Sequence, residues 1–144
     1  MGAAIPLPSD TATPDFPELA SEDPTGLVSA VRDGIPTERF ASLRDLLGVS
    51  TGELASVVGI TTSTLSRRRK RGVFDPDESE RILRIAHLAL RAVEVLNGKE
   101  NARSWLTQPA RALGGEAPLH FADTEPGARE VERLLLRLEH GVYS

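Results

Sequence analysis

The segment that most constrains the fold is residues 75–98, which read DPDESERILRIAHLALRAVEVLNG. It opens with an acidic cap, a proline at the first helical position and carboxylates in the first turn, and Gly98 stops it. A helix that is apolar on most of its circumference must be buried on most sides, so we expect it to be the spine of the fold and a candidate dimer contact. Its polar residues fall on one narrow stripe, formed by Arg84, His87, Arg91 and Glu94.

Helix signals recur on both sides of this segment, while strand signals are nearly absent. Caps, first-turn prolines and stopping glycines predict further helices over about 23–34, 36–48, 50–59, 61–72, 102–106 and 124–139. Either Thr61 or Thr62 caps the fourth of these. The last helix carries an i, i+3, i+4, i+7 apolar stripe, which we expect to face the protein's own core: Val131, Leu134, Leu135 and Leu138.

Charge is unevenly distributed along this chain of net charge −4. Residues 1–24 hold five of the ten prolines and no basic residue, a composition that predicts a disordered acidic tail. Five consecutive cations occupy 67–71, and no acid lies between Glu53 and Asp75. Such asymmetry indicates partners better than the total charge does.

Several chemistries are not expected. Zero cysteines exclude disulfides and thiolate metal sites and fit a reducing cytoplasm, where we expect the protein to work. Charged residues interrupt the apolar stretch 82–96, so we expect neither a membrane span nor, from the N-terminus, a signal peptide. The three histidines are widely separated and no phosphate loop or nucleophile elbow is present, so we expect no metal, no cofactor and no enzyme activity.

The segment around the cationic run predicts a helix-turn-helix. Ala55 is small enough for two helices to cross closely, and Gly59 tolerates the positive φ of a sharp turn. Leu65 then anchors the second helix from inside, helped by Leu54, Val58 and Ile60. The fold class that follows is all-α: a helix-turn-helix module joined through the long central helix to a small helical module.

The outward residues of the second helix are short hydroxyls followed by cations, which suit base edges and phosphates. If three or four of these cations touch phosphates, log K should fall against log salt with a slope of roughly −3 to −4 per subunit. The candidate DNA-binding residues are Thr62, Ser63, Thr64, Ser66, Arg67, Arg68, Arg69, Lys70 and Arg71.

The stretch LASVVGITTSTLSRRRKRG resembles the Xre-type helix-turn-helix of phage repressors and antitoxins. One departure concerns Arg68, because the common pattern places an apolar residue at this position. The resemblance implies binding of double-stranded operator DNA and regulation of transcription. A dimer is expected as well, since one helix-turn-helix reads few base pairs and paired half-sites multiply affinity.

The C-terminal stretch NARSWLTQPARALGGEAPLHFADTEPGAREVERLLLRLEHG is similar to the toxin-binding domain of Xre/MbcA/ParS antitoxins. Gly127 lets another group approach the last helix closely, and Trp105 is expected to pack into the core. The shared features are Trp105-Leu106, Pro109, Leu113-Gly114-Gly115, Pro118, Thr124, Gly127 and Gly141.

This second resemblance implies a protein partner, a RES-domain toxin that depletes NAD⁺, whose active site the C-terminal end of the antitoxin covers. It also implies a homodimer within a larger toxin–antitoxin complex. Leu136 lies off the apolar stripe of the last helix, and this position alone makes it a candidate contact with the partner. By position, the resemblance assigns the blocking role to Arg137, Glu139, His140, Gly141, Val142, Tyr143 and Ser144.

The expected organisation is a tail over 1–24, a DNA-binding domain over 25–86 and a toxin-binding domain over 87–144. The function expected is that of an antitoxin that also autoregulates its operon. Two alternatives stay open: a stand-alone repressor whose C-terminal module only dimerises, and a partner-binding adaptor whose basic run is a solvated face.

Overall fold

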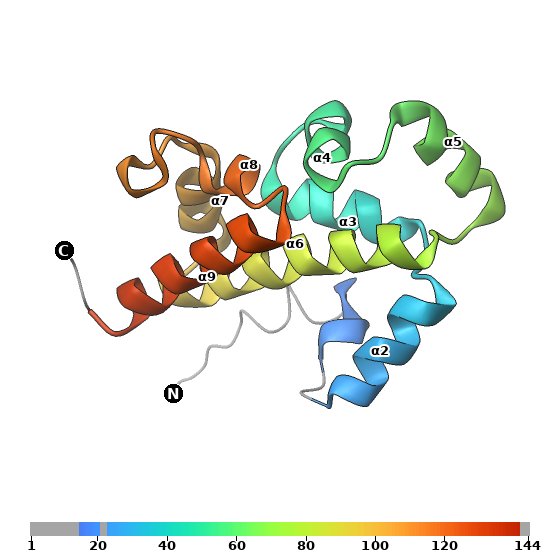
Figure 1. The fold of residues 1–144 in the computed structure, drawn as a ribbon, viewed down its shortest axis with the longest axis horizontal. Helices are drawn as coiled ribbons and strands as arrows, with labels where there is room; N and C mark the ends of the chain where they lie inside the picture. Colours follow the sequence, from blue (N-terminus) through green and yellow to red (C-terminus); the bar gives the residue numbers. More distant parts are fainter. Residues whose placement is uncertain (1–14, 21–22, 142–144) are drawn as a thin grey trace, which may run out of the picture.

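A computed structural model describes residues 15–20 and 23–141, and within these ranges the chain is helical with no strand (Figure 1). The all-α prediction is therefore confirmed. The elements in chain order are η2 (Pro17–Leu19), α2 (Pro24–Asp33), α3 (Glu38–Leu47), α4 (Thr51–Val58), α5 (Thr62–Arg71), α6 (Pro76–Leu96), α7 (Lys99–Thr107), η3 (Arg111–Leu113), α8 (Pro118–Phe121) and α9 (Glu125–Glu139).

Helix α6 is the spine, as its apolar circumference predicted. It contacts α2, α3, α4, α7 and α9, which surround it on different sides (Figure 1). Ten of its 21 residues are buried. The polar stripe remains at the surface: His87 and Glu94 are exposed, and Arg84 and Arg91 are half-buried with carboxylate partners.

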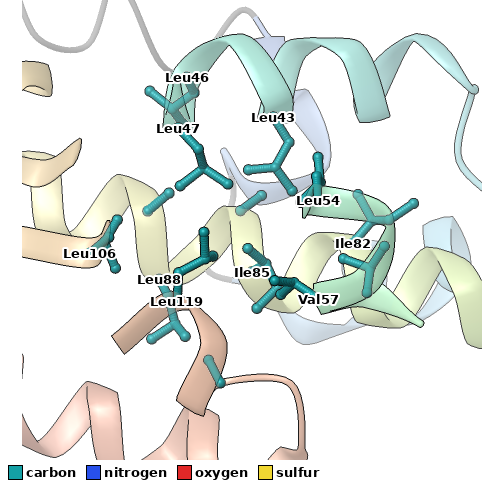
Figure 2. Close-up of a cluster of buried hydrophobic side chains, with 14 of the residues drawn as sticks. Leu43, Leu46, Leu47, Leu54, Val57, Ile82, Ile85, Leu88, Leu106 and Leu119 are labelled. Atoms are coloured by element: carbon teal, nitrogen blue, oxygen red, sulfur yellow. The ribbon is translucent and has the colours of Figure 1, made fainter. Parts of the chain in front are cut away.

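One continuous core runs along α6 and joins both halves of the chain. Leu43 of α3 and Leu54 of α4 meet α6 towards one end of the cluster, and Leu106 of α7 and Leu119 of α8 meet it towards the other (Figure 2). Leu47 lies with Leu106 and Leu119 around a small space in this core. Trp105 is half-buried against the same cluster. Because the core crosses the predicted domain boundary, the two modules form one packed unit.

The helix boundaries follow the capping residues read from the sequence. Ser50 Oγ accepts a hydrogen bond from the Glu53 N–H at 3.1 Å, and Thr61 Oγ1 accepts one from the Thr64 N–H at 3.0 Å. Thr61, rather than Thr62, is thus the cap of α5. Gly48, Gly59 and Gly72 adopt positive φ where α3, α4 and α5 end.

The N-terminal segment differs from expectation. Phe16 is buried in the core. Glu18 forms an ion pair with Arg39, whose Nε lies 3.0 and 2.9 Å from the two carboxylate oxygens of Glu18. The prediction of a disordered tail over 1–24 is therefore wrong for residues 15–20, because one aromatic ring and one ion pair are enough to dock them. Residues 1–14, 21 and 22 lie outside the described residues.

Two elements approach each other closely at Gly127, in the first turn of α9. A Cβ at this position would overlap the carbonyl oxygen of Phe121, where α8 ends. The prediction that Gly127 permits a close approach is confirmed, and the approaching group belongs to this chain. The absence of a side chain lets α9 fold back along α6 directly after the short helix α8.

Replacing Gly127 with alanine should therefore destabilise the fold, by roughly 1–3 kcal/mol, because the backbone of α8 must move to relieve the overlap. Gly26→Ala is the matched control, since nothing lies within 4 Å of a Cβ at this position in α2. We expect that control to be neutral or to gain up to about 1 kcal/mol from helix propensity. Urea denaturation measures both, and equal midpoints for the two variants would contradict the packing described for α8 and α9.

Candidate nucleic-acid interface and toxin-binding end

The corner between α4 and α5 has the geometry predicted for a helix-turn-helix. Ala55 of α4 is buried, and Gly59 closes α4 with a φ of 68°. Leu65 is 1% exposed and is the single residue of α5 that is buried. The remainder of this helix is half-buried or exposed.

The outer face of α5 presents the predicted hydroxyls. Thr62, Ser63 and Ser66 are exposed and Thr64 is half-buried. At 100° per residue, the positions roughly opposite Leu65 are Ser63, Arg67 and Lys70. Ser63 of the first turn and two cations therefore share the face that points away from the core.

The Arg67 guanidinium lies back along this face. Its Nη1 donates to the Ser63 hydroxyl at 3.1 Å, and its Nη2 donates to the Thr64 hydroxyl at 3.0 Å. Thr64 also accepts a hydrogen bond from the capping hydroxyl of Thr61 at 3.0 Å. Arg67 forms no ion pair among the described residues, so its charge is uncompensated.

Arg68 is arranged differently from its neighbours, with a side chain that is 17% exposed. Its Nε and Nη2 donate to both carboxylate oxygens of Glu78 at 2.8 and 2.9 Å, and Nη2 also donates to Asp75 at 2.8 Å. The hydrogen bond to Glu78, with the charges of Glu78 and Asp75, raises the Arg68 pKa above its ordinary value. This ion pair thus holds Arg68 at the position where the Xre-type pattern places an apolar residue.

Arg71 is also paired, although its side chain is more exposed. Its Nη2 donates to the second oxygen of Asp75 at 2.6 Å, and the guanidinium contacts the Val73 carbonyl. The hydrogen bond from Arg71, together with the charge of Arg68, lowers the Asp75 pKa below its ordinary value. Arg69 and Lys70 are exposed and make no ion pair within the part of the chain that the structure describes.

Two residues of α6 that sequence reasoning missed hold the helix-turn-helix in place. Glu78 accepts the backbone N–H of Asp75 at 2.8 Å as well as the Arg68 guanidinium, so it joins the start of α6 to the end of α5. Arg81 donates to the Val58 carbonyl at 2.6 Å, where α4 ends. The capping pattern of 75–78 indicated the first contact only in part, and no local pattern indicated the second.

The far end of the molecule is built by α9. Leu136 is 42% exposed, consistent with a position off the buried stripe of Val131 and Leu135. Glu139 is bound by the Arg91 guanidinium at 2.7 Å, and this hydrogen bond raises the Arg91 pKa. Arg137 lies 3.7 Å from Glu130. His140 and Gly141 are exposed, and Val142, Tyr143 and Ser144 lie outside the described residues.

The predicted site residues therefore form two groups at opposite ends of the long axis, α5 at one end and the last turn of α9 at the other (Figure 1). In the region between these two ends, polar contacts join the two modules. Arg103 of α7 donates to the Leu46 and Asp45 carbonyls at the end of α3, at 2.9 and 2.7 Å. His120 of α8 lies 2.8 Å from Glu53 of α4.

No helix among the described residues is long and apolar enough to cross a membrane. No group of three or more histidine, aspartate or glutamate side chains in residues 15–20 and 23–141 could hold a metal ion.

The fold and the corner between α4 and α5 define a helix-turn-helix protein with an attached helical module, and comparison with known families agrees. Residues 26–87 match the antitoxin Xre-like helix-turn-helix domain. Residues 91–141 match the antitoxin Xre/MbcA/ParS C-terminal toxin-binding domain. The two ranges meet within α6.

Curated relatives match along most of their length. An antitoxin Xre of Yersinia enterocolitica is 37% identical over 122 residues, which cover 83% of this chain and 82% of the relative. One from Photorhabdus laumondii is 34% identical over 120 residues, or 82% and 81% of the two chains. A protein of Sphingobium sp. named Prs ADP-ribosylating antitoxin is 24% identical over 144 residues, or 92% and 91%. The chain belongs to the Xre antitoxin family.

The different surroundings of Arg68 and Arg69 can be tested by stability alone. Arg68→Ala should lower the midpoint of thermal unfolding clearly, because it leaves the buried Glu78 carboxylate without its cation. Arg69→Ala, the adjacent control, should change the free energy of unfolding by less than about 0.5 kcal/mol. Calorimetry of the two variants measures these changes. An equal decrease in the unfolding midpoint of both variants would contradict the pairing of Arg68 with Glu78.

Proposed function

We propose that this protein is the antitoxin of a toxin–antitoxin pair, that it neutralises a RES-domain toxin which depletes NAD⁺, and that it represses its own operon by binding the operator. The observation that carries the proposal is the placement of two unlike surfaces at opposite ends of one packed body. One end offers hydroxyls and uncompensated cations, and the other an exposed helix terminus. Neither holds a catalytic constellation among the described residues.

The DNA-binding half rests on α5. Its first turn carries Thr62, Ser63 and Thr64 on a helix that buries only Leu65, so this turn is free to enter a major groove. Arg69 and Lys70, further along the helix, are suited to the phosphate backbone because no carboxylate of the described chain neutralises them. Arg68 and Arg71 contribute mainly to the position of α5.

A dimer and a cytoplasmic setting belong to this proposal. A single α5 covers few base pairs, and a two-fold pair of helices would read two half-sites. Half-sites about one helical turn apart would then be expected in the operator. Both the DNA and the toxin would be met in the cytoplasm.

The toxin-binding half rests on the end of α9. Leu136 supplies an exposed apolar side chain, and Arg137 and His140 flank it on the last turns. The Arg91–Glu139 ion pair joins this end of α9 to α6. A partner would therefore bind a helix terminus that is held against the core. Residues 140–144 follow it and are proposed to enter the toxin's active site.

The experiment that tests this function is co-expression with the toxin of the same operon. A chain ending at Glu139 should fold and bind operator DNA like the full chain, because no core residue is removed, yet fail to rescue growth. The matched control is the full chain carrying Arg69→Ala and Lys70→Ala, which should rescue growth while binding DNA poorly.

The readouts distinguish the rivals. Loss of cellular NAD⁺ in the unprotected cells supports a RES-type toxin, whereas ADP-ribosylated protein without that loss would contradict it. Full protection by the truncated chain would refute the blocking role of residues 140–144. A chain that binds the operator while no neighbouring gene is toxic would leave a stand-alone repressor as the function.

A further inference from the structure

We propose that Arg67 reads a guanine in the major groove, while Arg69 and Lys70 contact phosphates. This assignment rests on the proposed DNA-binding function and names the base that the same surface recognises. It divides the cationic run into three roles: base reading by Arg67, phosphate neutralisation by Arg69 and Lys70, and positioning of the helix by Arg68 and Arg71.

The position of Arg67 on the helix supports base reading. It lies two residues after Leu65, the buried anchor, and hence about 200° around the helix from it. It shares its face with Ser63, one turn nearer the end of the helix that would enter the groove. Arg69 and Lys70 are nearer the other end of α5, where the helix would pass the sugar–phosphate backbone.

The orientation of the guanidinium supports it more strongly. Both Nη atoms are held by hydroxyls of the first turn, Ser63 at 3.1 Å and Thr64 at 3.0 Å. The group is therefore turned toward the entering end of the helix and away from its sides, where phosphates would lie. Thr61 fixes the Thr64 hydroxyl in turn at 3.0 Å, so the arrangement begins at the helix cap.

The remaining hydrogen-bonding capacity matches guanine. An arginine carries five N–H donors and no acceptor. Two of these donors are used by Ser63 and Thr64, which leaves three for a ligand. Guanine presents two acceptors, O6 and N7, side by side in the major groove, and a planar fork that is already oriented can engage both.

Selection from a random double-stranded DNA library, followed by binding measurements on the selected duplex, tests the assignment. We expect one guanine per half-site to be strongly selected by the wild-type chain. Arg67→Ala should weaken binding to this duplex by roughly 5–150-fold and remove the preference at that position. The slope of log K against log salt should stay as in the wild type, because no phosphate contact is lost.

Lys70→Ala is the matched control on the same face. It should weaken binding to all sequences alike and make the salt slope less negative by about 0.9, while the guanine preference is kept. Ser63→Ala should reduce affinity and retain the preference, since it removes a support of the guanidinium and not the reading group. Thermal unfolding of each variant verifies that it is folded.

The possible outcomes distinguish the guanine assignment from the proposed DNA-binding function on which it rests. A wild-type chain that binds no duplex even at low salt refutes DNA binding and the guanine assignment together. A wild-type chain with sequence preference, whose Arg67→Ala variant keeps every base preference and loses salt dependence, overturns the assignment alone. In that case Arg67 would be a phosphate contact.

Discussion

The burial of α6 is the interaction on which the rest of the structure depends. Its apolar surface packs against α3 and α4 in one half of the chain and against α7 and α9 in the other, and the described residues form one core shared by both halves. At about 25 cal/mol for each Å² of apolar surface removed from water, such a shared core is the dominant stabilising term. The boundary between the two family domains falls inside this helix, so both domains owe their stability to the same side chains.

Helix α5 depends largely on electrostatic contacts for its position, because it buries only Leu65. Its C-terminal end is held by the Arg68–Glu78–Asp75 cluster, and the turn before it by the Arg81 contact to α4. Two of the five cations in 67–71 are thereby neutralised within the chain. The positive charge of 67–71 that is available to DNA is therefore smaller than the sequence indicates. The same ion pairs hold α5 in position.

The features predictable from sequence are those encoded locally. The caps Ser50 and Thr61, the glycines that end α3, α4 and α5, and the apolar circumference of 76–96 each lie within one turn or one helix, and the structure confirms them. The predicted stop at Gly98 is wrong by one residue, because Asn97 takes the left-handed conformation that ends α6. The pairing of Arg68 with Glu78 and of Arg91 with Glu139 joins separate elements, so no local pattern reveals it. Phe16 was missed because a single buried ring has no periodicity. Helix α8 has only four residues, which is too short to show an apolar periodicity.

We propose that one packed body serves DNA and toxin with separate ends. Native mass spectrometry of the antitoxin, its operator duplex and the toxin tests this most directly. The account predicts a single species containing all three components. Release of the duplex on addition of the toxin, with only binary complexes observed at any mixing ratio, would show that the two surfaces overlap or exclude one another and would contradict it.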